Sequence, residues 1–273
     1  MTSDKGPIDF LIVGAMKAGT TTLYRDLITH PDIAMPEQKE PETLVRFTSL
    51  DDIRRDYRDL FANAPHGSIR GEASTAYTKL PVYPGVAERA RALSNGKLRI
   101  VYIRRNPLER IISHYKHERQ HRRIDMPISH ALREVPELID FSRYDWQIAP
   151  WKACFGEENV LEIDLEVYAA DRAGMAKKVV AHLGADPARL PAPDSRLVAN
   201  SAREMKRIDN PLLDRFVRSV FYQRSIKPAV PRPWREATRR TILPSVPEID
   251  IELSDHDRAF IASELAREKP AAA

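Results

Sequence analysis

Cysteine is nearly absent from this chain, because Cys154 is the only one in 273 residues. A single cysteine excludes an intramolecular disulfide framework and a cysteine-rich metal site, and it fits a reducing compartment. The N-terminal residues contain no basic segment followed by an apolar one, as a secretory signal would. No apolar run approaches the roughly 20 residues that a membrane-spanning helix needs. These absences predict a cytoplasmic protein without a transmembrane segment.

The composition is otherwise that of an ordinary globular protein, with 42% hydrophobic and 30% charged residues. The sequence has no internal repeat and no long low-complexity stretch. A chain of this length can form one large α/β domain. We therefore predict a single domain over residues 1–273, in which residues 226–273 form an irregular and partly helical extension.

Positive charge is concentrated in one segment of the chain. The whole sequence has 43 Lys and Arg against 39 Asp and Glu, a net charge of +4. Residues 104–123 alone contain seven basic and two acidic side chains, so their positive excess is larger than that of the entire chain. Such a local concentration favours an anionic ligand over general nucleic-acid binding.

Apolar runs alternate with amphipathic segments along much of the chain. Three runs predict buried strands, and each is followed by a predicted helix. The strands are expected at Ile8–Val13, Leu98–Ile103 and Val160–Ile163, and the helices at Thr20–His30, after Asn106-Pro107, at about Glu166–His182 and, near the end of the chain, at about Asp255–Arg267. This alternation predicts an α/β fold with a doubly wound, mostly parallel sheet.

The loop after the first predicted strand, Gly14–Thr21, stands where a phosphate-binding loop belongs. Its glycines match the signature G-x-x-x-x-G-K-[ST] of nucleotide triphosphatases, but Thr20 occupies the place of the lysine, and Lys17 comes three residues earlier. The lysine of that signature reaches the β- and γ-phosphates, so its absence argues against ordinary ATP or GTP chemistry. The backbone, the threonine hydroxyls and Lys17 suit a compact 5′-phosphate with one further anionic group.

This loop resembles the 5′-phosphosulfate-binding loop of sulfotransferases that use 3′-phosphoadenosine 5′-phosphosulfate (PAPS), whose pattern is close to K-x-G-T-T-x-L. The resemblance implies a site for PAPS and its product adenosine 3′,5′-bisphosphate (PAP), without a metal. It also implies that Lys17 is catalytic and neutralises charge on the bridging oxygen as the sulfuryl group leaves. The residues that it assigns to the 5′-phosphate are Lys17, Ala18, Gly19, Thr20, Thr21 and Thr22.

A second motif follows the strand predicted at Leu98–Ile103. Its residues, R-N-P-L-E-R and then S-H-Y, resemble the 3′-phosphate element of the same family. Arg105 lies at the carboxyl end of the predicted strand, where open α/β sheets bind ligands, and Ser113 lies about 10 Å along the following helix. Both side chains are therefore expected to converge on the 3′-phosphate. The alternative interpretation is a capped amphipathic helix with a solvated basic face.

Further contacts follow from the resemblance alone. Pro36–Pro41 resembles the K-E-P segment that lines the acceptor cleft of these enzymes, which implies that Lys39 and Glu40 bind the substrate. Arg203 and Arg207 stand where the family places a loop that closes over the 3′-phosphate, so both are expected to bind the cofactor. The alternative for Pro36–Pro41 is an exposed loop without a role. The alternative for the segment that contains Arg203 and Arg207 is an ordinary charged helix start.

The segment Gly71–Tyr77 resembles the E-K-(S/T)-x-x-Y segment of glycan sulfotransferases similar to the heparan sulfate enzymes. The motif style is closest to these glycan-type enzymes and to bacterial sulfotransferases. On this match Glu72 is the catalytic general base, whereas Ala73 replaces the lysine of the pattern. His114 and His117 are the alternative bases, and His117 is also expected to bind the substrate.

The sequence thus predicts a sulfotransferase that moves the sulfuryl group of PAPS onto a hydroxyl or amine by in-line attack. The acceptor is expected to be a glycan, a glycolipid or a small molecule, and a homodimer is compatible with the sequence. One alternative is a nucleotide kinase or NTPase with a deviant phosphate loop, which requires a lysine at position 20 and a Walker-B aspartate after an apolar strand. Another is a non-catalytic module that binds PAP or PAPS, or a basic surface that binds polyanions.

Overall fold

The computed structural model describes residues 6–94, 96–194 and 251–269. Contacts between residues divide the chain into two compact units, one of Met1–Ala199 with Ile251–Ala273 and the other of Asn200–Asp250. All elements described below belong to the first unit. The single domain expected from the sequence stays a prediction.

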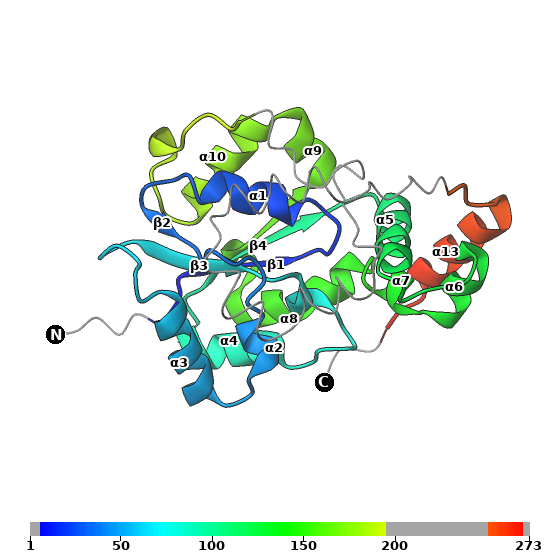
Figure 1. The fold of residues 1–273 in the computed structure, drawn as a ribbon, viewed down its shortest axis with the longest axis horizontal. Coiled ribbons are helices and arrows are strands. Elements are labelled where there is room, and N and C mark those ends of the chain that lie inside the picture. The colour runs from blue at the N-terminus through cyan, green and yellow to red at the C-terminus, as the bar shows by residue number, and fades with distance from the viewer. Residues whose placement is uncertain (1–5, 95, 195–250, 270–273) are drawn as a thin grey trace, which may run out of the picture. The chain divides into compact units, whose positions relative to one another are not determined.

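Five parallel strands form the central sheet, in the order β2-β3-β1-β4-β5 (Figure 1). The strands are β1 Phe10–Gly14, β2 Ile33–Ala34, β3 Ile69–Ala73, β4 Arg99–Arg104 and β5 Val160–Asp164. β1 lies at the centre because it pairs with both β3 and β4. The predicted α/β class with a parallel sheet is therefore confirmed.

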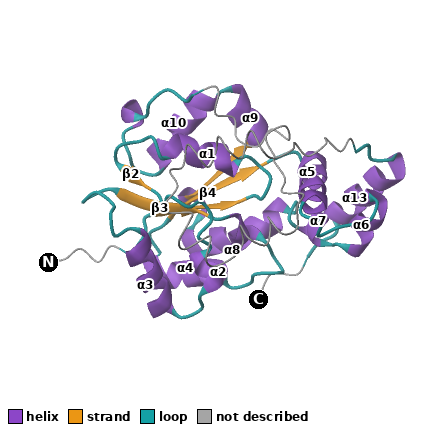
Figure 2. Ribbon diagram, viewed as in Figure 1, coloured by secondary structure: helices purple, strands orange, loops and turns teal. Residues whose placement is uncertain are grey.

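Helices cover both faces of this sheet (Figure 2). They are α1 Thr20–Leu27, α2 Thr43–Arg46, α3 Leu50–Leu60, α4 Val86–Ser94, α5 Pro107–Gln120, α6 Ile128–Glu134, α7 Glu137–Asp140, α8 Tyr144–Phe155, α9 Leu165–Ala170, α10 Arg172–His182 and α13 Asp255–Ala266, with the 3₁₀ helices η1 Thr75–Thr78, η2 Glu157–Asn159 and η3 Pro187–Arg189. One face packs against α1, α9 and α10, and the other packs against α2, α3, α4 and α8. A third hydrophobic cluster joins α5, α6, α7 and α13 beside the sheet (Figure 1).

The central strand β1 is apolar along its length because helices cover both of its faces. Successive residues of a strand point to opposite sides, so Leu11 and Val13 contribute to the cluster with α3, α4 and α8. Phe10 and Ile12 contribute to the cluster with α1 and α10. All four side chains are fully buried, and each such burial stabilises the fold by roughly 1.5–3 kcal/mol.

Helix α5 begins as the sequence predicts. Asn106 is its N-cap and Pro107 occupies the first turn, where the missing N–H of proline costs no hydrogen bond. Ile111 and Tyr115 of this helix are buried, and they pack in the third cluster together with Ile261 of α13. The helix of the second motif and the last described helix thus share one hydrophobic cluster.

The helix predicted at Glu166–His182 is instead two helices, α9 and α10. The break falls at Asp171, whose side chain accepts a hydrogen bond from the backbone N–H of Gly174 at 2.9 Å and caps α10. An aspartate that bonds to the nearby backbone competes with continuation of the preceding helix. The sequence pattern alone did not reveal this competition.

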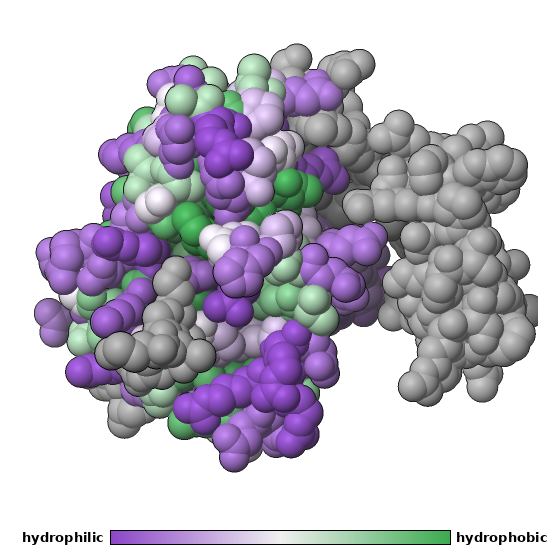
Figure 3. Space-filling model, turned by 90° about the vertical axis from the view of Figure 1, so that its left-hand side faces the viewer, coloured by the Kyte–Doolittle hydropathy of each residue, from purple (hydrophilic) through white to green (hydrophobic). Residues whose placement is uncertain are grey.

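One face of the described surface is mostly polar. Hydrophilic side chains predominate on the face drawn in Figure 3. The large hydrophobic residues with the greatest exposure, Ile28, Val82 and Val167, belong to separate segments of the chain. Among the described residues, no helix is long and apolar enough to cross a membrane.

Candidate active site

The predicted phosphate-binding loop connects β1 to α1 and contains two residues with positive φ, Lys17 (66°) and Gly19 (91°). Gly19 is the N-cap of α1, and a Cβ atom there would lie 2.6 Å from Leu165 Cδ1, so both sterics and backbone strain require glycine. The first turn of α1 contains no acidic residue, and its backbone N–H groups suit an anion. The other predicted contacts of the loop are buried or half-buried, namely Ala18, Thr20, Thr21 and Thr22.

The side chain of Lys17 is half-buried, and it makes no hydrogen bond or ion pair with another residue that the structure describes. Burial lowers the pKa of Lys17, and the nearby charge of Arg105 lowers this pKa further, whereas Glu118 and Glu40 raise it. Arg105 therefore lies near enough to act on Lys17 electrostatically. The structure thus brings together one cation from each of the two predicted nucleotide motifs.

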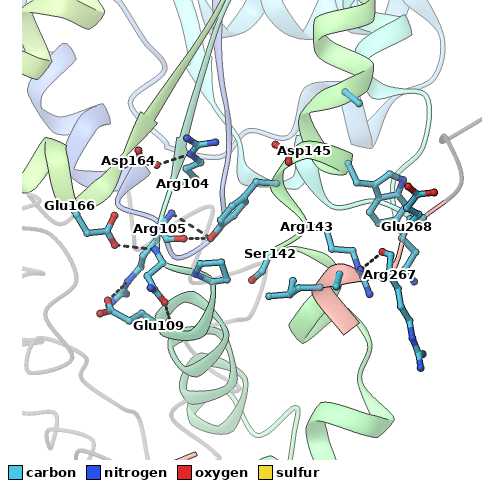
Figure 4. Close-up of a pocket in the computed structure, with 18 residues that line it drawn as sticks. Arg104, Arg105, Glu109, Ser142, Arg143, Asp145, Asp164, Glu166, Arg267 and Glu268 are labelled. Atoms are coloured by element: carbon cyan, nitrogen blue, oxygen red, sulfur yellow. Dashed lines mark hydrogen bonds and ion pairs between the residues drawn. The ribbon is translucent and has the colours of Figure 1, made fainter. Parts of the chain in front are cut away.

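Arg105 follows β4 directly and is half-buried. Its Nη2 and Nε atoms lie 2.8 Å and 3.0 Å from Oε2 of Glu109, and the Tyr144 hydroxyl donates to its carbonyl oxygen at 2.6 Å (Figure 4). Glu109 is exposed, and an exposed ion pair contributes only about 0–1 kcal/mol, so a phosphate can replace it as the partner of Arg105. Ser113 is half-buried on the same helix that begins after Arg105.

A cavity of about 1040 Å³ lies beside Arg105 (Figure 4). Its walls come from the ends of β4 and β5, the starts of α5 and α8, and the residues that follow α13. Much of the charge on these walls is paired, as in the bond from Arg104 Nε to Asp164 Oδ1 at 2.6 Å. Among the predicted site residues that the structure describes, Arg105 alone lines this cavity. The cavity therefore borders the predicted nucleotide site and does not include the phosphate-binding loop.

Glu72 lies on β3 and is fully buried. The Tyr57 hydroxyl donates to Glu72 Oε1 at 2.7 Å, the Tyr77 hydroxyl donates to the same oxygen, and Ser74 Oγ lies 3.4 Å from Oε2. Burial raises the pKa of Glu72 to about 7, although the three hydroxyl donors lower this pKa. Glu72 therefore sits in a closed cluster of hydroxyl groups, and its carboxylate has no exposed surface.

Two histidines of α5 lie beside the lysine of the phosphate loop. His114 is buried and stacks on the ring of Phe141, with 5.6 Å between the ring centroids. Burial, together with the charges of Arg110 and other cations, lowers the pKa of His114 to about 2. Burial and the charge of Lys17 lower the pKa of His117 to about 3. Both rings are therefore neutral near pH 7, and His117 Nδ1 has no hydrogen-bond partner among the described residues.

The predicted acceptor loop also lies at this edge of the sheet. Lys39 and Glu40 form an ion pair, and the backbone N–H of Glu40 donates to the carbonyl oxygen of Ala73, the last residue of β3, at 3.1 Å. Thr75 Oγ1 lies 3.4 Å from Glu40 Oε1. The charges of Glu40 and Lys39 both act on Lys17, so the loop and the phosphate-binding loop are neighbours.

Several functional candidates at this edge were not predicted from the sequence. Lys79 acts electrostatically on both histidines, and Glu118 acts on Lys17. Neither residue belongs to one of the motifs that carry the resemblance. Arg110 is the second arginine of R-N-P-L-E-R and is fully buried. The motif alone does not indicate this burial. The predicted cofactor contacts Arg203 and Arg207 lie outside the described residues.

No group of three or more His, Cys, Asp or Glu side chains that could hold a metal ion occurs in the described part of the chain. The charged groups gathered at this site are three cations, Lys17, Arg105 and Lys39, and two carboxylates, Glu118 and Glu40, which leaves a positive excess. This arrangement favours the binding of an anion over the binding of a cation.

A family model for the sulfotransferase domain matches residues 7–207, and no curated protein matches the chain significantly. The crystal structure of a sulfotransferase from Alicyclobacillus acidocaldarius is 27% identical, covers 77% of this chain and 89% of its own, and has a TM-score of 0.60. The sulfotransferase domain from the curacin biosynthetic pathway is 14% identical over 98% of this chain and 100% of its own, with a TM-score of 0.49. Mouse sulfotransferase SULT7A1, complexed with PAP, is 20% identical over 76% of this chain and 69% of its own, with a TM-score of 0.47.

The family match covers more than half of the sequence, and it includes the phosphate-binding loop, the second motif and all five strands of the sheet. The Alicyclobacillus sulfotransferase agrees with this match in both sequence and fold. The chain therefore belongs to the sulfotransferase domain family and is an enzyme that transfers sulfuryl groups.

Proposed function

We propose that the enzyme takes its sulfuryl group from PAPS and transfers it to a hydroxyl or amine of a glycan, a glycolipid or a small molecule. The nearness of Lys17 and Arg105 carries this proposal, because these cations come from separate motifs and follow the neighbouring strands β1 and β4. PAPS has two anionic ends, a 5′-phosphosulfate and a 3′-phosphate, and the two motifs supply a cation for each. Family membership sets aside the nucleotide kinase alternative.

The proposed reaction is an in-line displacement at sulfur. The acceptor oxygen or nitrogen forms a bond to sulfur while the bond from sulfur to the bridging oxygen of the 5′-phosphate breaks, and PAP leaves. Lys17 stabilises the negative charge that develops on that oxygen. Because burial lowers the pKa of Lys17, its ammonium is a stronger proton donor than that of an exposed lysine.

Glu72 is our proposal for the base that takes the proton of the acceptor. Its pKa of about 7 suits proton transfer near neutral pH. Its carboxylate is fully buried, and so is Ser74, whose hydroxyl donates to it at 3.4 Å, so the proton must pass through a bonded hydroxyl and the cluster must open to admit the acceptor. His117 is the second candidate, because its ring lies near Lys17 and its Nδ1 has no hydrogen-bond partner among the described residues.

Calorimetric titration with PAP, AMP and ATP in the absence of magnesium tests the nucleotide assignment. Wild-type protein should bind PAP far more tightly than AMP, because only PAP carries the 3′-phosphate. Arg105→Ala should weaken PAP binding by about 10- to 100-fold and leave AMP binding unchanged, since a hydrogen bond to a charged group contributes about 1.5–3 kcal/mol. Arg99→Ala, at the opposite end of the same strand, is the matched control and should change neither affinity.

Two results would contradict the proposal. A preference for ATP over PAP would assign the phosphate-binding loop to other chemistry. Equal losses of PAP and AMP affinity in Arg105→Ala would mean that Arg105 does not read the 3′-phosphate.

A further inference from the structure

Lys79 lies at the C-terminal edge of the sheet on a firmly held piece of backbone. It follows η1, whose last residue, Thr78, donates a hydrogen bond from Oγ1 to the carbonyl oxygen of Val13 at 2.8 Å. On the other side, the side-chain amide of Gln147 bonds both the N–H and the carbonyl oxygen of Leu80, at 2.8 Å and 2.9 Å. The backbone of Lys79 is therefore fixed relative to β1, the strand that leads into the phosphate-binding loop.

The contact with the loop itself is close. A Cβ atom on Gly14, the last residue of β1, would lie 2.0 Å from Thr78 Oγ1, so Thr78 packs directly on the start of the phosphate-binding loop. A lysine side chain extends roughly 6 Å from its Cα atom. Lys79 is consequently held where its ammonium can reach a small group bound by this loop, and its position does not depend on the acceptor loop.

The ammonium of Lys79 has no anionic partner in the described part of the chain. It makes no hydrogen bond or ion pair there, and its Nζ lies over the ring of Phe141, 6.0 Å from the centroid. Burial lowers the pKa of Lys79, while the charges of Glu40, Glu42 and Glu118 raise it. Burying an ammonium costs free energy unless an anion pairs with it.

Two other buried cations of this protein have carboxylate partners, whereas the fully buried Arg110 bonds Ser142 Oγ and the carbonyl oxygen of Leu138 instead. Arg172 bonds Asp26 at 2.6 Å, and Arg143 bonds Asp140 at 2.8 Å. Lys17, which the phosphate-binding loop contributes, shares the unpaired state of Lys79 within the described residues. Lys17 and Lys79 are therefore two half-buried lysines of the same edge of the sheet that have no carboxylate partner in the described part of the chain, which favours an anion that both of them bind.

The histidines of α5 connect the two lysines. His114 stacks on the same Phe141 ring that Lys79 contacts. The positive charges of Lys79 and Lys17 each act on both His114 and His117. Lys79 and Lys17 therefore both lie near the same two histidines.

We propose that Lys79 is a second cation of the sulfuryl site, which contacts the sulfuryl oxygens of bound PAPS and acts together with Lys17. This inference rests on the proposed use of PAPS. Lys17 faces the bridging oxygen that leaves with the phosphate, and Lys79 holds the group that is transferred. A fixed cation at this position stabilises the sulfuryl oxygens without having to reorganise during the reaction.

The affinities of PAP and PAPS test this role without knowledge of the acceptor, because the two nucleotides differ only in the sulfuryl group. Calorimetry should show that Lys79→Met weakens PAPS binding by about tenfold, since one charge-assisted hydrogen bond is lost, and changes PAP binding by less than about twofold. Lys97→Met removes the same charge from an exposed turn and should change neither affinity. Lys79→Arg keeps the charge and should retain most of the PAPS affinity.

The possible failures are distinguishable. If wild-type protein binds neither PAP nor PAPS, the proposed function is wrong and this inference is wrong with it. If wild-type protein binds both, and Lys79→Met either leaves both affinities unchanged or lowers them equally, only the role of Lys79 is wrong. Thermal unfolding of each variant checks its folding, and Lys79→Gln, with a polar side chain, provides a second measurement should Lys79→Met unfold.

Discussion

The environment of Glu72 shows how two opposing effects set the properties of one side chain. Full burial disfavours the charged carboxylate and raises its pKa, whereas the hydroxyls of Tyr77, Tyr57 and Ser74 stabilise the charged form. Asp26 is buried as well, but the guanidinium of Arg172 pairs with it. Glu72 has no such cation among the residues that the structure describes, so burial dominates and its pKa rises to about 7.

Glu72→Gln tests this balance through the pH dependence of stability. Between the ordinary pKa of 4.5 and the raised value of about 7, the native protein binds more protons at Glu72 than the unfolded chain does, so rising pH lowers the free energy of unfolding. Glutamine does not titrate. Relative to wild type, the free energy of unfolding of the variant should therefore rise by roughly 2–3 kcal/mol between pH 5 and pH 8. Urea unfolding measures this difference.

The control for this measurement is Glu37→Gln at an exposed position. A difference between Glu72→Gln and wild type that stays constant over this pH range would contradict the raised pKa. The same value also bears on catalysis, because a base must be deprotonated to accept a proton. With Glu72 as the base the rate falls below pH 7, whereas with His117, whose pKa is about 3, the rate stays level down to about pH 4.

At the scale of single elements, the start of α5 sets the position of several site residues at once. The Asn106 side chain accepts hydrogen bonds from the N–H groups of Leu108 and Glu109, at 3.1 Å and 3.4 Å. The backbone N–H of Asn106 donates to Glu166 Oε1 at 3.0 Å. Because α5 carries Ser113 and both histidines, a shift of its first turn moves every one of them.

Asn106→Ala should lower the free energy of unfolding by about 1 kcal/mol, the usual loss for an N-cap. It should also weaken PAP binding severalfold, because Arg105 precedes the cap directly. Asp171→Ala removes the N-cap of α10, which carries no predicted site residue, so this control should lose similar stability and keep its PAP affinity. Urea unfolding and calorimetry measure both quantities. Equal losses of PAP affinity in the two variants would contradict this account of α5.

At the scale of the described molecule, a helix near the end of the sequence, α13, packs in the same hydrophobic cluster as the helix of the second nucleotide motif. α13 packs against α6 and α7, and its fully buried Ile261 shares a hydrophobic cluster with Ile111 and Tyr115 of α5. Ion pairs reinforce this contact, since the buried Asp140 bonds Lys269 at 3.2 Å. The far end of the chain therefore supports the helix that carries the second nucleotide motif.

Ile261→Ala should lower the free energy of unfolding by roughly 2–5 kcal/mol, because it removes buried methyl groups and leaves a cavity. Ser263→Ala, at an exposed position of the same helix, should change stability by less than about 0.5 kcal/mol. Chemical denaturation of the full chain measures both. If Ile261→Ala lowers the free energy of unfolding no more than Ser263→Ala does, α13 does not pack in this hydrophobic cluster in solution.

The sequence by itself determined the elements whose signals are local. The apolar runs of β1, β4 and β5, the glycines around the phosphate-binding loop and the Asn-Pro start of α5 are all readable from neighbouring residues, and these elements form as predicted. β3 has no apolar run, since it reads Ile-Arg-Gly-Glu-Ala, and its place beside β1 depends on pairing between distant segments. The division at Asp171 depends on a hydrogen bond that the helical periodicity does not reveal.

Only the tertiary structure decided which charged side chains are buried and which of them have partners. Tyr57 reaches Glu72 from a separate helix, and Phe141 brings Lys79 beside His114. Burial, and the pKa values that follow from it, depend on side chains that are far apart in the sequence. A sequence motif therefore predicted the proposed role of Glu72, whereas only the folded arrangement indicated the proposed role of Lys79.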